Sequence, residues 1–74
     1  MDADNLIRMA NRIGEFFAAM PDRNEALDGI AQHLRKFWEP RMRAAIVAHV
    51  CAGAQELDPL VVAAIHRLNS KEGP

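Results

Sequence analysis

The run Phe37-Trp38-Glu39-Pro40-Arg41-Met42-Arg43, just past the middle of the chain, decides how the fold is divided. A residue that precedes proline is pushed out of the α region, so a helix that reaches Trp38 should end there or at Glu39. Proline is well tolerated as the first residue of a helix, because its missing N–H would have no partner there. The run therefore predicts a tight corner between two helices, with an aromatic pair before the proline and two arginines after it.

Apolar residues recur at helical spacing on both sides of this corner. Pro21 separates two such stretches upstream, while Gly53 ends a third and Asp58-Pro59 begins a fourth downstream. The chain has no Thr or Tyr and one Ser, so strand-forming residues are scarce. We predict an all-α fold, a small bundle of three to four short helices, in one domain over residues 1–74, with helices at about 4–20, 24–38, 40–52 and 59–69 and a frayed tail at 70–74.

One glycine lies inside the second predicted helix. Gly29 costs roughly 1 kcal/mol relative to alanine at such a position. It either allows another helix to approach closely or is simply tolerated.

The size and composition of the chain limit the classes of protein to consider. A chain of 74 residues buries only about 60% of the surface that its unfolded form exposes. Small helical units often compensate by oligomerising or by docking on a larger protein. Half of the residues are hydrophobic, too many for a disordered chain, yet no apolar run approaches the ~20 residues that span a bilayer.

The beginning of the chain and its cysteine content indicate a compartment. The first residues lack the basic start of a signal peptide, and Asp2 and Asp4 lie where positive charge would be expected. The single Cys51 suits a reducing environment. We therefore expect a cytoplasmic protein without membrane contact.

The residues that carry chemistry are few and scattered. Nucleophilic catalysis needs a positioned base, but His49 and Cys51 are two residues apart and point in different directions on a helix. We expect Cys51 to be a small buried thiol. The three histidines lie on three different predicted helices without metal-ligand spacing. We predict no enzymatic activity, no metal site and no bound cofactor for this chain.

A cationic cluster near the corner raises nucleic-acid binding as an alternative of another class. A helix-turn-helix DNA-binding protein would place a recognition helix after a short turn. However, the formal net charge is −1, the turn contains proline instead of glycine, and the third helix becomes apolar after Arg43. We therefore expect no nucleic acid at the cluster His33, Arg35, Lys36, Arg41 and Arg43.

The corner also fits a surface that binds another protein. Trp and Arg are enriched at binding hot spots, and Trp38 lies close to two arginines. Trp38 can equally fill the core of the domain, and the sequence does not decide between these roles. The adjacent Phe16 and Phe17 add apolar surface that so small a bundle has little room to bury. The candidate partner-binding residues are Phe37, Trp38, Arg41, Met42, Arg43, Phe16 and Phe17.

Two runs carry a resemblance to a known family. They are Asn5-Leu6-Ile7-Arg8-Met9-Ala10-Asn11 and Phe37-Trp38-Glu39-Pro40-Arg41-Met42-Arg43, with Phe16-Phe17 between them. With these residues the chain resembles the small delta subunit of NAD-dependent formate dehydrogenase. The resemblance continues more weakly through Leu57, Pro59 and Val61, and it covers most of the chain.

The resemblance implies a non-catalytic accessory subunit that docks on and stabilises the catalytic alpha subunit of a cytoplasmic complex. The larger subunits would carry a molybdenum or tungsten bis-pyranopterin, iron–sulfur clusters and FMN, and would pass electrons from formate to NAD. An assembly chaperone for cofactor loading, absent from the mature complex, is the alternative within the family. A homodimer of the isolated chain is also open, since the apolar first helix can self-associate.

Overall fold

The structure is a computed structural model that describes residues 2–53 and 55–72, with side chains up to residue 69. It contains four helices, α1 (Ala3–Phe17), α2 (Arg23–Phe37), α3 (Pro40–Cys51) and α4 (Pro59–Glu72), and no strand among the described residues. The predicted all-α bundle is therefore confirmed. Helix α4 continues past the expected end at residue 69, and residues 73–74 of the expected frayed tail lie outside the described range.

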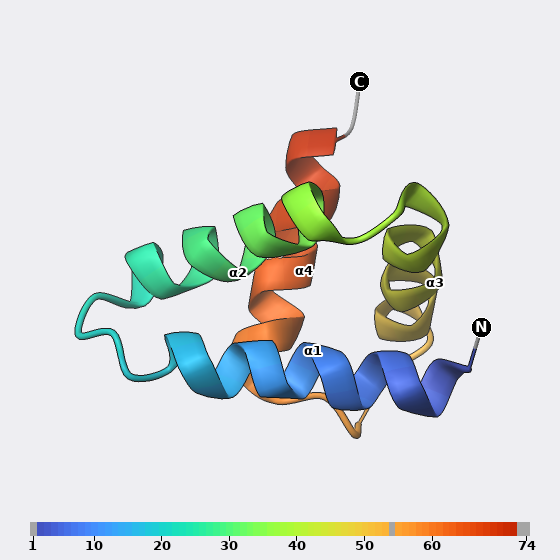
Figure 1. The fold of residues 1–74 in the computed structure, drawn as a ribbon, viewed down its shortest axis with the longest axis horizontal. Coiled ribbons are helices and arrows are strands. Elements are labelled where there is room, and N and C mark those ends of the chain that lie inside the picture. Colours follow the sequence, from blue (N-terminus) through green and yellow to red (C-terminus); the bar gives the residue numbers. More distant parts are fainter. Residues whose placement is uncertain (1, 54, 73–74) are drawn as a thin grey trace.

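The four helices pack around one interior. Helices α1 and α2 form an antiparallel pair joined by a short loop, and α4 crosses behind both of them (Figure 1). Helix α3 stands beside the N-terminal half of α1, after the corner that follows α2. The most extensive contact between two helices is that of α2 with α4.

The helix ends follow from local chemistry. The side chain of Asp2 accepts a hydrogen bond from the N–H of Asp4 at 3.1 Å, and Asp22 caps α2 in the same way through Asn24 at 2.9 Å. Helix α2 ends at Phe37, and both residues before Pro40 have extended backbones. Helix α1 ends at Phe17, three residues before the expected end, and a tight turn leads into the proline that follows.

The core is built from aliphatic side chains of all four helices and one indole. Fully burying an aliphatic side chain of the size of leucine contributes about 1.5–3 kcal/mol relative to leaving it exposed. No phenylalanine belongs to the buried cluster, which consists of Leu6, Ile7, Ala10, Leu27, Ile30, Ala31, Leu34, Trp38, Ile46, Val50, Leu57, Val61, Ala64, Ile65 and Leu68.

Two glycines allow close contacts between helices. A Cβ atom at Gly14 would overlap the Cγ2 methyl group of Val61 on α4, and one at Gly29 would overlap the ring of Phe17 on α1. Each glycine therefore occupies a place where alanine would displace a neighbour. Of the two interpretations of Gly29, close approach is the correct one.

No helix among residues 2–53 and 55–72 combines the length and the apolar composition needed to cross a bilayer.

The packing of α1 on α4 predicts the effect of Gly14→Ala. Alanine favours a helix by about 1 kcal/mol over glycine, but overpacking a core costs roughly 1–3 kcal/mol. Because Val61 is fully buried and stiff, we expect a net loss of up to about 2 kcal/mol in the free energy of unfolding, measured with urea.

The matched control is Gly14→Ala with Val61→Ala, which removes the methyl group that alanine would meet. The double variant should be less destabilised than the sum of the single variants. A Gly14→Ala protein more stable than the parent would show that the α1–α4 contact is looser than described.

Candidate protein-docking surface

Two phenylalanine rings lie outside the core. Phe16 is 74% exposed and Phe37 is 71% exposed, although the interior is filled by other side chains. Exposed apolar residues scattered singly are normal, whereas grouped ones mark interaction sites. Whether the two exposed rings mark an interaction site therefore depends on the side chains that surround them.

The exposed rings belong to a continuous row of aromatic side chains. Phe16 packs edge to face on Phe17, with ring centroids 5.1 Å apart. Phe17 lies 6.5 Å from the ring of His33, which in turn lies 4.8 Å from that of Phe37. These four residues form the aromatic row, which bridges the C-terminal half of α1 and the C-terminal half of α2.

The local structure explains the order of the row. Successive residues of a helix point about 100° apart, so Phe16 and Phe17 cannot both face α2. Phe17 covers Gly29, and Phe16 consequently points outward. His33 and Phe37 lie one turn apart on the same face of α2 and therefore continue the row.

The surface next to the row is hollowed along α1. One hollow of about 310 Å³ is lined by Arg12, Ile13, Phe16, Phe17 and His33. A second, of about 430 Å³, is lined by Asp2, Asn5, Leu6, Met9, Glu39, Arg41 and Met42. Met9 and Ile13 are one turn apart, so both hollows follow one face of the helix. We call the two hollows together the α1 groove.

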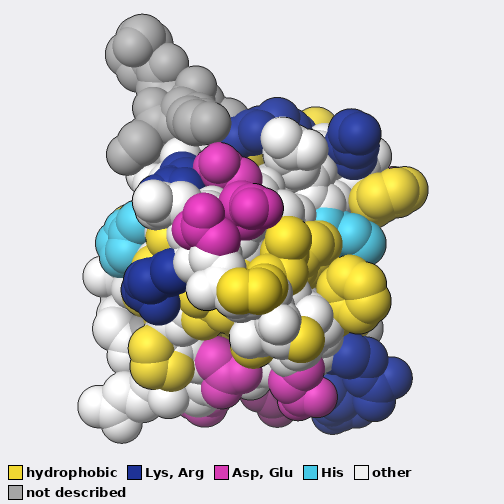
Figure 2. All heavy atoms as spheres, turned by 90° about the vertical axis from the view of Figure 1, so that its left-hand side faces the viewer, with side chains coloured by type: hydrophobic (Ala, Val, Ile, Leu, Met, Phe, Trp, Pro, Cys, Tyr) yellow, Lys and Arg dark blue, Asp and Glu magenta, His cyan; other side chains and the backbone are white. Residues whose placement is uncertain are grey.

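The space-filling view shows how hydrophobic and charged side chains are distributed over this surface. Figure 2 shows hydrophobic side chains gathered around a histidine on the right of the molecule. Lys and Arg side chains lie above and below this group, while one group of acidic side chains lies to its left and another lies beneath it, beside the lower cations.

Five of the seven candidate partner-binding residues lie along the row or the groove. Phe16, Phe17 and Phe37 belong to the aromatic row, while Arg41 and Met42 line the second hollow. Arg12, Ile13 and Met9 also line the groove but were not among the candidates. Their spacing of one turn along α1 is the signal that identifies them.

Trp38 does not lie on this surface. Its side chain is 5% exposed and belongs to the core cluster, so the structure gives it the core role that the sequence left open. Its indole is not accessible to a partner in this conformation. The reason is geometric, because the chain turns at Trp38 and an extended backbone there directs the ring inward.

Arg43 also acts within its own chain. Its Nη1 donates hydrogen bonds to the carbonyl oxygens of Leu34 at 3.4 Å, of Arg35 at 3.2 Å and of Trp38. The carbonyl of Leu34 also accepts the N–H of Trp38, and all three carbonyls lie at the C-terminal end of α2, where cations are favoured. Arg43 therefore stabilises the corner within its own chain, and its role in partner binding stays a prediction.

The cationic cluster considered for DNA is divided in the same way. Arg43 is occupied at the end of α2, and His33 packs between Phe17 and Phe37. Since two of its five members have these internal contacts, the cluster does not form a single cationic face.

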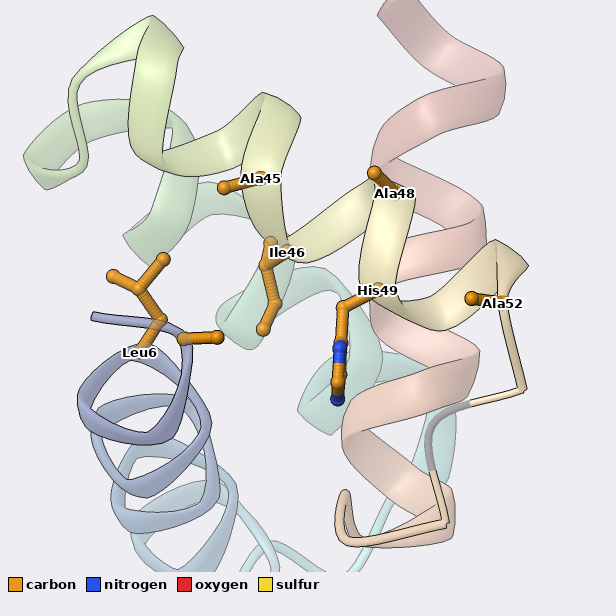
Figure 3. A pocket seen from close by; sticks show the side chains of 7 residues that line it. Leu6, Ala45, Ile46, Ala48, His49 and Ala52 are labelled. Carbon is orange, nitrogen blue, oxygen red and sulfur yellow. The ribbon is translucent and has the colours of Figure 1, made fainter. Parts of the chain in front are cut away.

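A further hollow of about 330 Å³ separates the start of α1 from α3. Figure 3 shows that α3 supplies most of its side chains and that Leu6 approaches from α1. Its lining is apolar apart from one imidazole and consists of Ala3, Leu6, Ala45, Ile46, Ala48, His49 and Ala52.

The end of α3 holds the other polar groups of interest. His49 Nε2 lies 3.4 Å from Glu56 Oε1, and the pKa of Glu56 is lowered by a hydrogen bond from its own backbone and then by one from His49.

Cys51 is exposed, so the expectation of a buried thiol is wrong. It is the last residue of α3. Within the described chain, no three or more His, Cys, Asp or Glu residues are grouped to hold a metal ion.

The fold and this surface define a small all-α protein with an exposed aromatic row beside a groove. A family model for the NADH-dependent formate dehydrogenase delta subunit FdsD matches residues 5–65. The match spans most of the chain, which therefore belongs to this family, as the resemblance predicted. A comparison with curated proteins gave no match.

The hydrogen bonds of Arg43 predict a loss of stability in Arg43→Gln. Hydrogen bonds to a charged group contribute about 1.5–3 kcal/mol, so we expect a loss of roughly 1–3 kcal/mol in urea unfolding. Arg41→Gln is the matched control and should change the stability by less than about 0.5 kcal/mol, since Arg41 is exposed. Equal stabilities of the two variants would contradict the assignment.

Proposed function

We propose that this chain is a non-catalytic accessory subunit that docks on the catalytic alpha subunit of a cytoplasmic, molybdenum- or tungsten-containing formate dehydrogenase and stabilises it. The observation that carries the proposal is the exposure of Phe16 and Phe37 beside a core that is complete without them. Membership of the delta-subunit family supports the choice of partner.

The aromatic row supplies the driving force for this association. A phenylalanine side chain buries on the order of 150–250 Å² when it is fully covered. Apolar area removed from water contributes roughly 25 cal/mol per Å², so covering both exposed rings yields several kcal/mol before the costs of association. The row is therefore the centre of the proposed interface, and Arg41 and Met42 extend it along the α1 groove.

Membership of the family supports a division of labour between this chain and the larger subunits. We assign the bis-pyranopterin, the iron–sulfur clusters, the FMN and the binding of NAD to the larger subunits. The contribution of this chain is apolar surface on a helical scaffold, which would hold part of the catalytic subunit in place.

Copurification with a Phe16→Ser, Phe37→Ser double variant tests this proposal. Both side chains are exposed in the free chain, so the variant should stay folded. We expect the amount of catalytic subunit that a tagged variant retains to fall roughly tenfold or more, because aromatic hot spots cost about 2 kcal/mol or more when truncated.

His66→Ser on α4 is the control, since His66 is exposed and lies outside the row and the groove. It should copurify like the parent. Undiminished copurification of the folded double variant would remove the aromatic row from the interface.

A second measurement separates stabilisation from assembly. The catalytic subunit is produced without this chain, and its molybdenum or tungsten content and its half-life of activity are measured. We expect a loaded enzyme that loses activity faster than the complete complex. A subunit without its metal would instead assign the chain to cofactor loading.

A further inference from the structure

The charged side chains around the aromatic row indicate which charge the partner should carry. The first hollow of the α1 groove contains one cation, Arg12, and no carboxylate, whereas the second contains Arg41 together with Asp2 and Glu39. Arg12 lies one turn before Phe16 on α1, and Lys36 lies one turn after His33 on α2. Basic side chains therefore flank the row on both of its helices.

These cations are available to a partner. The ion pairs and side-chain hydrogen bonds among the described residues include neither Arg12 nor Lys36. Both residues are exposed. A carboxylate brought to this edge would gain an attractive contact, whereas a cation would meet like charge.

The shape of the groove indicates what form the partner takes there. Leu6, Met9, Ile13 and Phe17 follow one another along α1 through both hollows. From Leu6 to Phe17 the helix rises by about 16 Å, or three turns. Two hollows that follow one another along a helix face over this length match an amphipathic helix that inserts apolar residues at successive turns.

We propose that the α1 groove and the aromatic row take an amphipathic helix of the larger subunit, with an apolar stripe against Ile13 and Phe16 and carboxylates opposite Arg12 and Lys36. This inference rests on the proposed function and specifies the partner chemistry of the same surface. An anionic membrane is disfavoured as the occupant, because lipid-binding segments carry about four to eight clustered basic residues, whereas this surface combines Arg12, Lys36 and Arg41 with the carboxylates of Asp2 and Glu39.

The test compares two charge reversals in the copurified complex. Arg12→Glu with Lys36→Glu should weaken association roughly tenfold or more, because carboxylates on both sides would repel. Arg8→Glu with Arg23→Glu is the matched control, since it changes the net charge equally at exposed residues that line neither hollow and lie more than one turn along the chain from every residue of the aromatic row. It should change association less than about twofold.

A photo-crosslinking amino acid at position 16 then identifies the segment that lies on the row. We expect the crosslinked peptide, sequenced by mass spectrometry, to come from a helix of the larger subunit with an apolar stripe edged by Asp or Glu. A crosslink to a basic segment or to a strand would overturn the inference.

The outcomes distinguish docking through the aromatic row from recognition of an acidic amphipathic helix. If the Phe16→Ser, Phe37→Ser variant no longer associates with the catalytic subunit but the Arg12, Lys36 reversal still does, docking through the row is supported and the proposal of an acidic partner helix is wrong. If neither variant loses association, both proposals fall. Binding of the complete chain to vesicles of equal parts phosphatidylcholine and phosphatidylserine, abolished by the Arg12, Lys36 reversal, would assign the surface to a membrane instead.

Discussion

The contact between the ring of Phe17 and Gly29 is the constraint on which the exposed surface depends. The ring occupies the space that any side chain at position 29 would need. Because neighbouring residues of a helix diverge by about 100°, this contact directs Phe16 into solvent. The exposure of Phe16 is thus a consequence of how α1 packs on α2. A larger residue at position 29 would disturb the row and the packing together.

The corner between α2 and α3 is held from within by two residues that looked equally suited to a partner. Trp38 fills the core, and Arg43 returns to the last carbonyls of α2. Their internal roles fix where the rest of the corner lies. Phe37 is left outside at the end of α2, and Arg41 and Met42 line the groove beside α1. The candidate interface is therefore built on a corner that the chain stabilises by itself.

Periodicity and capping chemistry were enough to predict the four helices, and the corner run was enough to suggest the family. The side-chain roles at the corner could not be predicted in the same way. Hot-spot composition favours Trp and Arg at interfaces, but it does not tell which way a backbone with extended residues before Pro40 directs them. Cys51 shows the same limit, since its burial depends on whether another helix covers the end of α3. The spacing of Arg12 and Ile13 along α1 places them on the face of Phe16, but the sequence does not show that His33 of α2 completes a hollow with them.

The central claim is that the aromatic row is open in the free chain and covered in the complex. Hydroxyl-radical footprinting with mass spectrometry measures the oxidation of Phe16 and Phe37 in both states. We predict strong labelling of both rings in the isolated chain, as their exposures of 74% and 71% require, and marked protection in the formate dehydrogenase complex. His66 should be labelled equally in both states. Unchanged labelling of the two rings, with protection elsewhere on the chain, would contradict it.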